Sequence, residues 1–166
     1  SKQRSHYLRP TITAPSIDPR IRTTAQEIAG DTKDVLEIIN RLVGWIQANI
    51  QKSPVDVFSA LDVLETKKAE CQGHAYLYTA FARALGIPTR VVNGLAYSEE
   101  LKGFLYHSWN ESLIGGTWLS VDPTFGQVGV DATHIKLLEG EATAELMPLV
   151  DILGRIRAKI LSLEAP

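Results

Sequence analysis

The most regular hydrophobic pattern in the chain lies between Cys71 and Leu85. Apolar residues recur there every three or four positions, a spacing that places them on one face of an α-helix. This face comprises Ala75, Leu77, Tyr78, Ala80, Phe81, Ala82 and Leu85. Gly86 suits the left-handed position just past a helix end, and Pro88 prevents continuation. The sequence therefore predicts a buried helix over residues 71–85 that begins at the only cysteine.

Helical patterns also precede this segment. A short helix is expected over residues 23–28. A second helix is expected to run to residue 50 from a cap at Asp31 or Thr32, because short polar side chains at that position accept hydrogen bonds from free backbone N–H groups. Residues 53–66 predict a loop with a short helical turn. Together these elements form the helical half of a fold.

After the cysteine helix the hydrophobic period changes from 3.6 to 2, which is typical of strands. Strands are expected over residues 89–97, 104–114 and 117–122, the first of them interrupted or bulged at Asn93-Gly94. Gly115-Gly116 is a two-residue hairpin signal between the last two strands. The pattern thus places helices in the first half of the chain and strands after the cysteine helix.

The two ends of the chain differ from its centre. Pro10, Pro15 and Pro19 stand among polar and basic residues, so we expect residues 1–20 to form an extended arm or linker. Residues 21–140 would form the main domain. Helical spacing returns in residues 141–166, which predicts an amphipathic helix that packs on the domain.

The hairpin signal also fixes a register. If Gly115 and Gly116 are the two loop residues, counting back pairs Trp109 with Asp122. Directly paired residues of an antiparallel ladder point to the same side, and alternate residues along a strand share a face. Asp122 would then be a diagonal neighbour of His107, with Cβ atoms about 5 to 8 Å apart. A slip of one residue would separate the two groups, so this inference depends on the turn.

Composition narrows the classes of protein. The chain has 166 residues, 45% of them hydrophobic, enough for one domain with a substantial core. A net charge of −2 gives no reason to expect a nucleic acid or an anionic membrane as the main partner. No apolar run approaches the roughly 20 residues needed to span a bilayer. A single cysteine excludes an internal disulfide and a cysteine-rich zinc module.

The chain begins at Ser1 and carries no signal-peptide pattern, so we expect it to be part of a longer chain. Its compartment cannot be read from its ends. If it was excised from a longer exported protein, its place would be periplasmic or extracytoplasmic.

The position of Cys71 gives it candidate chemistry. In the first turn of a helix, the macrodipole and the free backbone N–H groups favour thiolate over thiol. The alternative is a small buried hydrophobe. A thiol that attacks a carbonyl needs a base, and the base needs a partner that fixes its tautomer. Cys71, His107 and Asp122 would fill these three roles, with backbone N–H groups of the helix start stabilising the oxyanion.

Four segments carry a resemblance to a known family. They are Cys71-Gln72-Gly73-His74-Ala75, residues 83–92 (Arg-Ala-Leu-Gly-Ile-Pro-Thr-Arg-Val-Val), His107-Ser108-Trp109-Asn110-Glu111, and Trp118-Leu119-Ser120-Val121-Asp122-Pro123-Thr124. In this order they resemble the transglutaminase-like superfamily, over about residues 28–138. Residues 131–135 (Asp-Ala-Thr-His-Ile) resemble a segment that follows the aspartate in bacterial members.

The resemblance implies a papain-like α+β fold and a triad of Cys71, His107 and Asp122. It implies chemistry at an amide carbonyl of a peptide or protein through a thioester, with transfer to an amine (a transglutaminase) or to water (a peptidase or amidase), and no cofactor. The superfamily also contains members that have lost activity. The alternative function is therefore a catalytically silent module that binds peptides or proteins.

Two departures from the family pattern concern the oxyanion site. Ala69-Glu70 precede Cys71 where glycine is common, and a nearby Glu70 would oppose the thiolate. No side-chain donor can be assigned just before Cys71, which leaves Gln72 as a candidate oxyanion donor. Trp109 is a candidate wall of the substrate cleft, with a core position as the alternative.

The remaining histidines have other interpretations. Cys71 and His74 share a helix face, so with His107 they could form a small metal site, although this would leave Asp122 unused. We expect no metal, and His74 more simply packs below the nucleophile. His134 and Glu111 are expected to be structural. No calcium-loop pattern is present, which predicts activity independent of metal.

Overall fold

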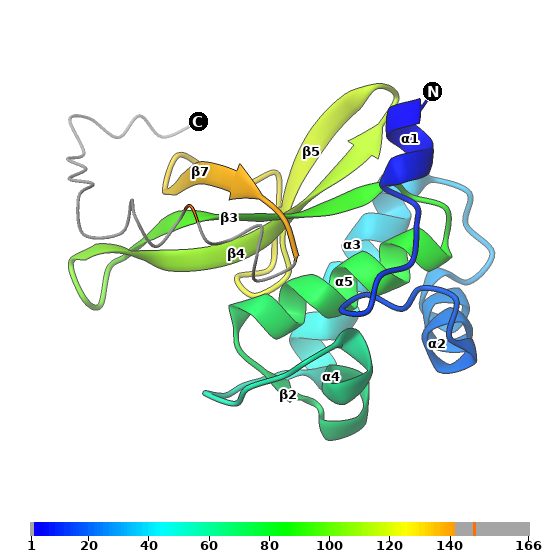
Figure 1. Ribbon diagram of the computed structural model, residues 1–166, viewed down its shortest axis with the longest axis horizontal. Coiled ribbons are helices and arrows are strands. Elements are labelled where there is room, and N and C mark those ends of the chain that lie inside the picture. The colour runs from blue at the N-terminus through cyan, green and yellow to red at the C-terminus, as the bar shows by residue number, and fades with distance from the viewer. Residues whose placement is uncertain (1, 142–147, 149–166) are drawn as a thin grey trace.

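The structure, a computed structural model, describes residues 2–141 and 148 (Figure 1). A group of helices lies beside a five-stranded antiparallel sheet with strand order β6-β5-β4-β3-β7. The helices are α1 (Lys2–His6), α2 (Pro19–Ala29), α3 (Val35–Asn49), α4 (Ala60–Thr66) and α5 (Cys71–Ala84). The sheet strands are β3 (Thr89–Ser98), β4 (Gly103–Ile114), β5 (Thr117–Asp122), β6 (Gln127–Val128) and β7 (His134–Glu139). The predicted α+β class is confirmed.

Helix α5 is the centre of the core, as its pattern predicted. It is buried from Gly73 to Arg83 and contacts α2, α3 and α4 as well as the sheet. The Asn110 amide of β4 donates to the Ala75 carbonyl at 3.2 Å and to the Thr79 hydroxyl at 2.8 Å. A buried helix face is thus joined to the sheet by hydrogen bonds as well as by apolar packing, which fixes where its N-terminus lies.

The hairpin between β4 and β5 has the predicted register. Ile114 pairs with Thr117 and Glu111 pairs with Ser120. Gly115 and Gly116 both have positive φ, 57° and 89°, as a two-residue turn of this type requires. The face of β4 that carries His107 is therefore also the face of β5 that carries Asp122.

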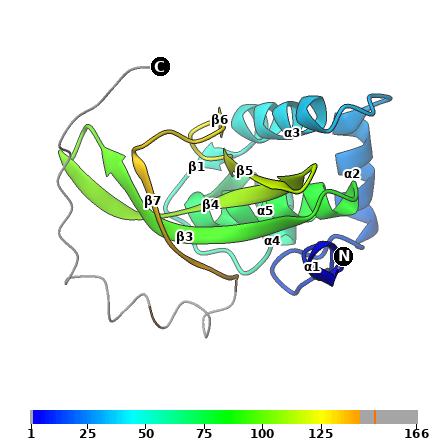
Figure 2. The same ribbon diagram turned by 90° about the horizontal axis from the view of Figure 1, so that it is seen from above.

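The bulge predicted at Asn93-Gly94 is present where β3 pairs with β7. The strand β7 itself was not predicted, and it lies at the edge of the sheet, paired antiparallel with β3 (Figure 2). The two backbones approach so closely that a Cβ at Gly94 would overlap the Ile135 carbonyl oxygen and lie 2.9 Å from Cη2 of Trp109. Glycine at this position is what allows β7 to pair so closely with β3 at the edge of the sheet.

The helix beginnings differ from the sequence expectations. Helix α3 begins at Val35 and is capped by Asp34, whose carboxylate accepts the Leu36 and Glu37 N–H groups, and not by Asp31 or Thr32. Asp34 satisfies the same capping rule, three positions after Asp31. Helix α2 begins at Pro19, earlier than the pattern over residues 23–28 indicated, because Asp18 caps it.

The N-terminal arm is not simply extended. Residues 2–6 form α1, Ala14 and Ser16 are buried, and the Ala60 N–H donates to the Thr13 carbonyl at 2.8 Å. Near the other end, the Glu141 carboxylate accepts hydrogen bonds from Thr11, Thr13 and Arg83. The helix predicted over residues 141–166 lies outside the described residues, apart from Glu141 and Pro148. The division into arm, catalytic domain and C-terminal helix stays a prediction.

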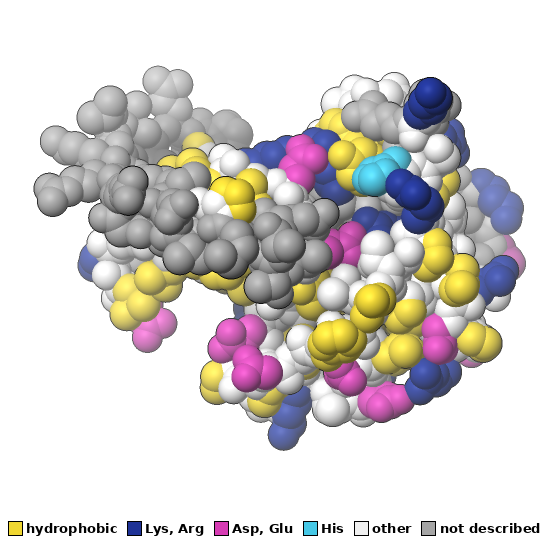
Figure 3. Space-filling view, in the orientation of Figure 1, with side chains coloured by type: hydrophobic (Ala, Val, Ile, Leu, Met, Phe, Trp, Pro, Cys, Tyr) yellow, Lys and Arg dark blue, Asp and Glu magenta, His cyan; other side chains and the backbone are white. Residues whose placement is uncertain are grey.

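The described surface carries mixed charge. Figure 3 shows basic and acidic side chains interspersed over one face, which agrees with the small net charge. Within the described part of the chain, none of the helices has the length and apolar character that a bilayer crossing requires.

Replacement of Gly94 tests the close approach of β7. We expect Gly94→Ala to lower the free energy of unfolding by about 3 kcal/mol or more, because the added methyl group meets backbone rather than a flexible side chain. The matched control is Gly44→Ala, since Gly44 lies exposed within α3 with no atom within 4 Å of the added Cβ. There alanine should stabilise by about 0.5 to 1 kcal/mol. Urea unfolding of both variants measures this, and equal effects would contradict it.

Candidate active site

Cys71 is the first residue of α5 and is half-buried. Just before it, β2 (Lys68–Ala69) pairs in parallel with β1 (Gln51–Lys52), which fixes the approach to the helix. Glu70 stands at the N-cap with an extended backbone, and no side chain caps the helix. The first-turn N–H groups are thus free of side-chain acceptors beside the sulfur. Such an arrangement can receive an oxyanion.

His107 and Asp122 are joined as the register predicted. Nε2 of His107 lies 2.7 Å from Oδ2 of Asp122, and both side chains are buried. A carboxylate can only accept, so Nε2 carries the proton and Nδ1 is left available to the thiol. Burial lowers the pKa of His107, but hydrogen bonds with Asp122 and Cys71 outweigh it and raise the pKa to about 9. The structure therefore brings the three predicted residues together.

The Asp122 carboxylate is fully buried and completely hydrogen-bonded. Oδ1 accepts the backbone N–H groups of Thr124 and Phe125 at 2.9 and 3.0 Å, in a turn that contains Pro123. Oδ2 accepts both His107 and His134, each at 2.7 Å. Burial raises the pKa of Asp122, yet the hydrogen bonds from the two imidazoles bring it well below its usual range. The group is therefore an anion at neutral pH, at the centre of the site.

Aromatic rings hold the imidazole of His107 from two sides. Phe125 stacks on it with ring centroids 4.5 Å apart and planes 11° apart. Trp109 lies 6.0 Å away in a roughly parallel orientation. Only 2% of Trp109 is exposed, so it lies beneath the triad and does not form a wall of the cleft, contrary to the first of the two interpretations. Phe125, 48% exposed, is the ring that solvent and substrate can reach.

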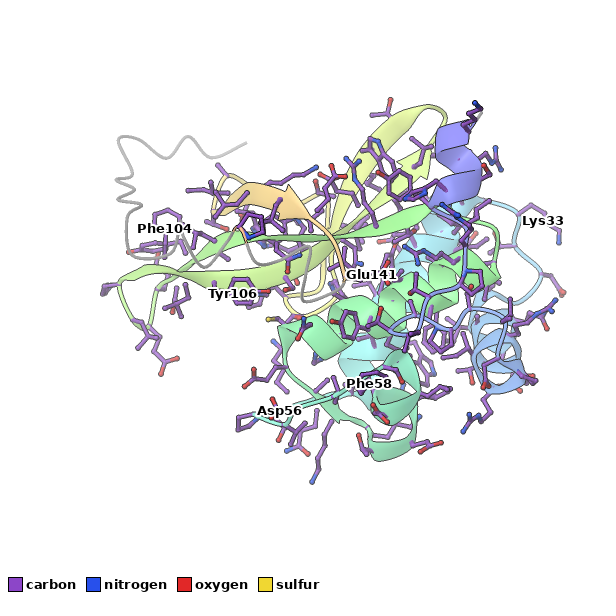
Figure 4. The ribbon with its side chains drawn as sticks, viewed as in Figure 1. Lys33, Asp56, Phe58, Phe104, Tyr106 and Glu141 are labelled. Atoms are coloured by element: carbon purple, nitrogen blue, oxygen red, sulfur yellow. The ribbon has the colours of Figure 1, made fainter. Side chains whose placement is uncertain are left out.

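Other side chains border the thiol. Figure 4 shows Tyr106 on the side of β4 that faces the start of α5. Burial raises the pKa of Tyr106, and the nearby Cys71 raises it further. Lys52 lies with its ammonium 5.6 Å from the Phe125 ring centroid. Gln72 is half-buried beside Cys71, and its role as an oxyanion donor stays a prediction.

The metal set considered from the sequence is not the one that the structure brings together. Within the described residues, the converging group is His107, Asp122 and His134, with ligand atoms within 4.8 Å of one another. Both nitrogen-to-oxygen distances are hydrogen-bond distances, and each bond needs a proton where a metal would need a free lone pair. His74 points elsewhere, since its Nδ1 lies 2.7 Å from the Glu70 carbonyl oxygen. Hydrogen bonds account for the whole group.

Sequence reasoning missed Phe125 and the contact of His134 with Asp122. Phe125 follows the aspartate within a turn that has no periodic pattern. The sole signal for His134 was the resemblance of residues 131–135 to a family segment. Glu111 is structural as expected, since its carboxylate pairs with Arg90 at 2.6 Å and with Lys136 at 2.9 Å.

Comparison with known proteins identifies the family. The model of the transglutaminase-like superfamily matches residues 22–123. The chain belongs to this superfamily. Kyphoscoliosis peptidase of Mus musculus is 32% identical over 114 residues, 61% of this chain and 17% of the relative, and the Homo sapiens protein is 29% identical over 135 residues, 75% and 20%. The chain thus spans about a fifth of the length of these curated relatives.

Solved structures show the same fold. A crystal structure of a Cytophaga hutchinsonii protein assigned as a cysteine protease has a TM-score of 0.75 at 24% identity, covering 87% of this chain and 49% of that one. The periplasmic domain of TgpA from Pseudomonas aeruginosa has a TM-score of 0.59 at 24% identity, covering 75% and 48%. A transglutaminase-like, papain-like arrangement of helix and sheet is therefore shared with both.

The charge on Asp122 makes stability depend on pH in a defined direction. We expect Asp122→Asn to destabilise the protein by about 3 to 5 kcal/mol at pH 7, because two buried imidazoles lose their anionic acceptor. A carboxyl whose folded pKa is depressed stabilises the fold above its unfolded value, near 3.9, and loses that contribution as the pH falls. The difference between wild type and variant should therefore narrow below about pH 4.

Urea unfolding at pH 7, 5 and 3.5 measures this narrowing. Asp34→Asn is the control, because asparagine also caps helices and the change leaves the site untouched. A difference between wild type and Asp122→Asn that stays constant down to pH 3.5 would contradict the assignment of a buried anion.

Proposed function

We propose that this domain catalyses cysteine-dependent acyl transfer or hydrolysis at an amide carbonyl of a peptide or protein, through a thioester intermediate. The observation that carries the proposal is the position of His107. Its imidazole is bonded to the buried Asp122 through one nitrogen and interacts with Cys71, at the uncapped start of a helix. A base that is fixed from behind and raised in pKa is what an attacking thiol requires.

The first half-reaction transfers the acyl group to sulfur. The Cys71 proton passes to Nδ1 of His107, and the thiolate attacks the carbonyl carbon while the carbonyl electron pair moves to oxygen. First-turn N–H groups of α5, that of Cys71 among them, stabilise the oxyanion. The carbon–nitrogen bond then breaks as His107 returns the proton to the leaving amine. A thioester and a free amine result.

The second half-reaction releases the acyl group. Water or an amine attacks the thioester carbonyl, and His107 removes the proton of the nucleophile. The carbon–sulfur bond breaks, and the proton on His107 goes back to the sulfur. Water gives a carboxylic acid, and an amine gives a new amide. Throughout, Asp122 stays ionised and stabilises the imidazolium, as its depressed pKa requires.

The nature of the acceptor decides between the two enzyme classes. The site supplies the same chemistry for both. The relatives at 32% and 29% identity are named as peptidases, which supports hydrolysis as the first activity to assay. The half-exposed Phe125 and Tyr106 beside the thiol offer apolar and aromatic surface to a peptide. We propose a peptide or protein substrate.

The rate of alkylation of Cys71 by iodoacetamide against pH tests the thiol–imidazole pair. Having a single cysteine makes the readout unambiguous. We expect an inflection well below the reference value of about 8.5 in wild type, and its loss in His107→Ala. His6→Ala is the matched control, because His6 lies exposed on α1 and is distant from Cys71 in the sequence. A profile near the reference value in all three proteins would favour the silent binding module.

Chelation tests the independence from metal. No step above uses a metal, so peptide hydrolysis or amine incorporation should survive EDTA within about twofold. Added Zn²⁺ should inhibit, because thiolate and imidazole are ligands that zinc prefers. The control is His74→Leu, which removes a histidine outside the converging group and should leave the zinc inhibition in place. Activity lost on chelation and restored by a divalent ion would contradict the proposal.

A further inference from the structure

His134 has no part in the reaction described above, yet it is built into the site. It begins β7, its side chain is 1% exposed, and its Nε2 lies 2.7 Å from Oδ2 of Asp122. This is the same oxygen, at the same distance, that His107 contacts. Asp122 therefore has two imidazole partners, of which one adjoins the nucleophile and the other comes from the far edge of the sheet.

The hydrogen bond to Asp122 places a proton on Nε2 of His134. The ionised carboxylate of Asp122 can only accept, so the Nε2 atom of His134 carries a proton as that of His107 does. Its other nitrogen, Nδ1, lies 3.2 Å from the Thr133 hydroxyl and 3.5 Å from a carboxylate oxygen of Asp131. These groups, with Asp122 and His107, are the titratable and polar neighbours that face the ring. Thr133 and Asp131 thus border the edge of the ring that lies opposite Asp122.

Packing also restrains the His134 ring. The Trp109 ring meets it edge to face, with centroids 5.1 Å apart. The next residue, Ile135, lies against Gly94, where no side chain separates the strands. The ring therefore has little freedom to leave the carboxylate. This gives the buried, otherwise unassigned Trp109 a role beneath the site.

A second donor changes what happens when His107 gains or loses its proton. With Oδ1 bound to two backbone N–H groups and Oδ2 bound to His134, the orientation of the carboxylate does not depend on His107. The acceptor for Nε2–H of His107 then stays in place through both half-reactions. Without His134, the two backbone N–H bonds would be the only contacts that hold the carboxylate independently of His107.

We propose that His134 is a positioning residue, which fixes the Asp122 carboxylate through an Nε2–H hydrogen bond and so keeps His107 directed at Cys71. This inference rests on the proposed function for its effect on the thiol, whereas the hydrogen bond itself is independent of it. The chain Asp131–Thr133–His134–Asp122–His107–Cys71 connects the edge strand β7 to the nucleophile.

Two substitutions separate positioning from packing. Gln places an amide N–H near the position of the imidazole Nε2, whereas Leu fills similar space without a donor. We expect His134→Leu to lower the rate of Cys71 alkylation at pH 7, and any amide hydrolysis, by about 10- to 100-fold, the range found for outer hydrogen-bond partners of functional groups. His134→Gln should recover most of that loss. Lys136→Gln, two residues along β7 and bonded to Glu111 and Glu139, is the matched control and should equal wild type.

The pH profile supplies the readout that a packing role would not move. In His134→Leu the inflection of the Cys71 alkylation rate should shift toward the reference value of about 8.5, in the direction expected for His107→Ala. In His134→Gln it should stay near the wild-type position. Equal losses in the Leu and Gln variants with an unshifted inflection would overturn the inference. If wild type itself shows no inflection below the reference value, the proposed function fails, which is a different result.

Nitrogen NMR of the wild-type imidazoles keeps the inference testable even if a variant does not fold. Both His107 and His134 should carry a proton on Nε2, seen as two downfield ring protons protected from exchange. Asp122→Asn should displace both signals together. A His134 that carries its proton on Nδ1 alone in wild type would overturn the inference, whatever the activity of the protein.

Discussion

The fold depends on one buried carboxylate, that of Asp122, which is ionised at neutral pH. Asp122 is fully buried, and an unpaired charge there would cost several kcal/mol. Four donors meet it, from the turn after β5, from β4 and from β7, so each of these elements has to end at a set place. The close approach at Gly94, the glycine turn and the core position of Trp109 all serve that arrangement.

Local rules were enough to predict much of this. The Gly115-Gly116 turn sets the register, and the register alone put Asp122 on the His107 face, because a two-residue loop leaves no freedom in counting. The start of α5 at Cys71 followed from its apolar period. The predicted first residues of α2 and α3 were less accurate, because Asp18 and Asp34 compete as caps with neighbouring polar residues.

The parts that could not be predicted depend on contacts distant in sequence. Strand β7 is short, carries a lysine and a histidine, and pairs across a bulge, so no alternation marks its role. In the sequence His134 is an ordinary polar strand residue, and only the pairing of β7 with β3 beside Gly94 brings it to Asp122. Phe125 lies in a turn, and its stacking on His107 comes from the turn geometry around Asp122. Trp109 lies in the core rather than at the cleft, and tertiary contacts decide between these two positions.

The order of the site along the chain has a consequence for biosynthesis. The proposed nucleophile, Cys71, belongs to a helix in the middle of the sequence, and the proposed base, His107, follows on β4. The donors that hold the carboxylate of Asp122 come last, on the turn after β5 and on β7. A chain that emerges from the ribosome N-terminus first therefore exposes its thiol well before the residues that activate it. On the proposed function, Cys71 therefore gains its activating neighbours only after β7 has been synthesised.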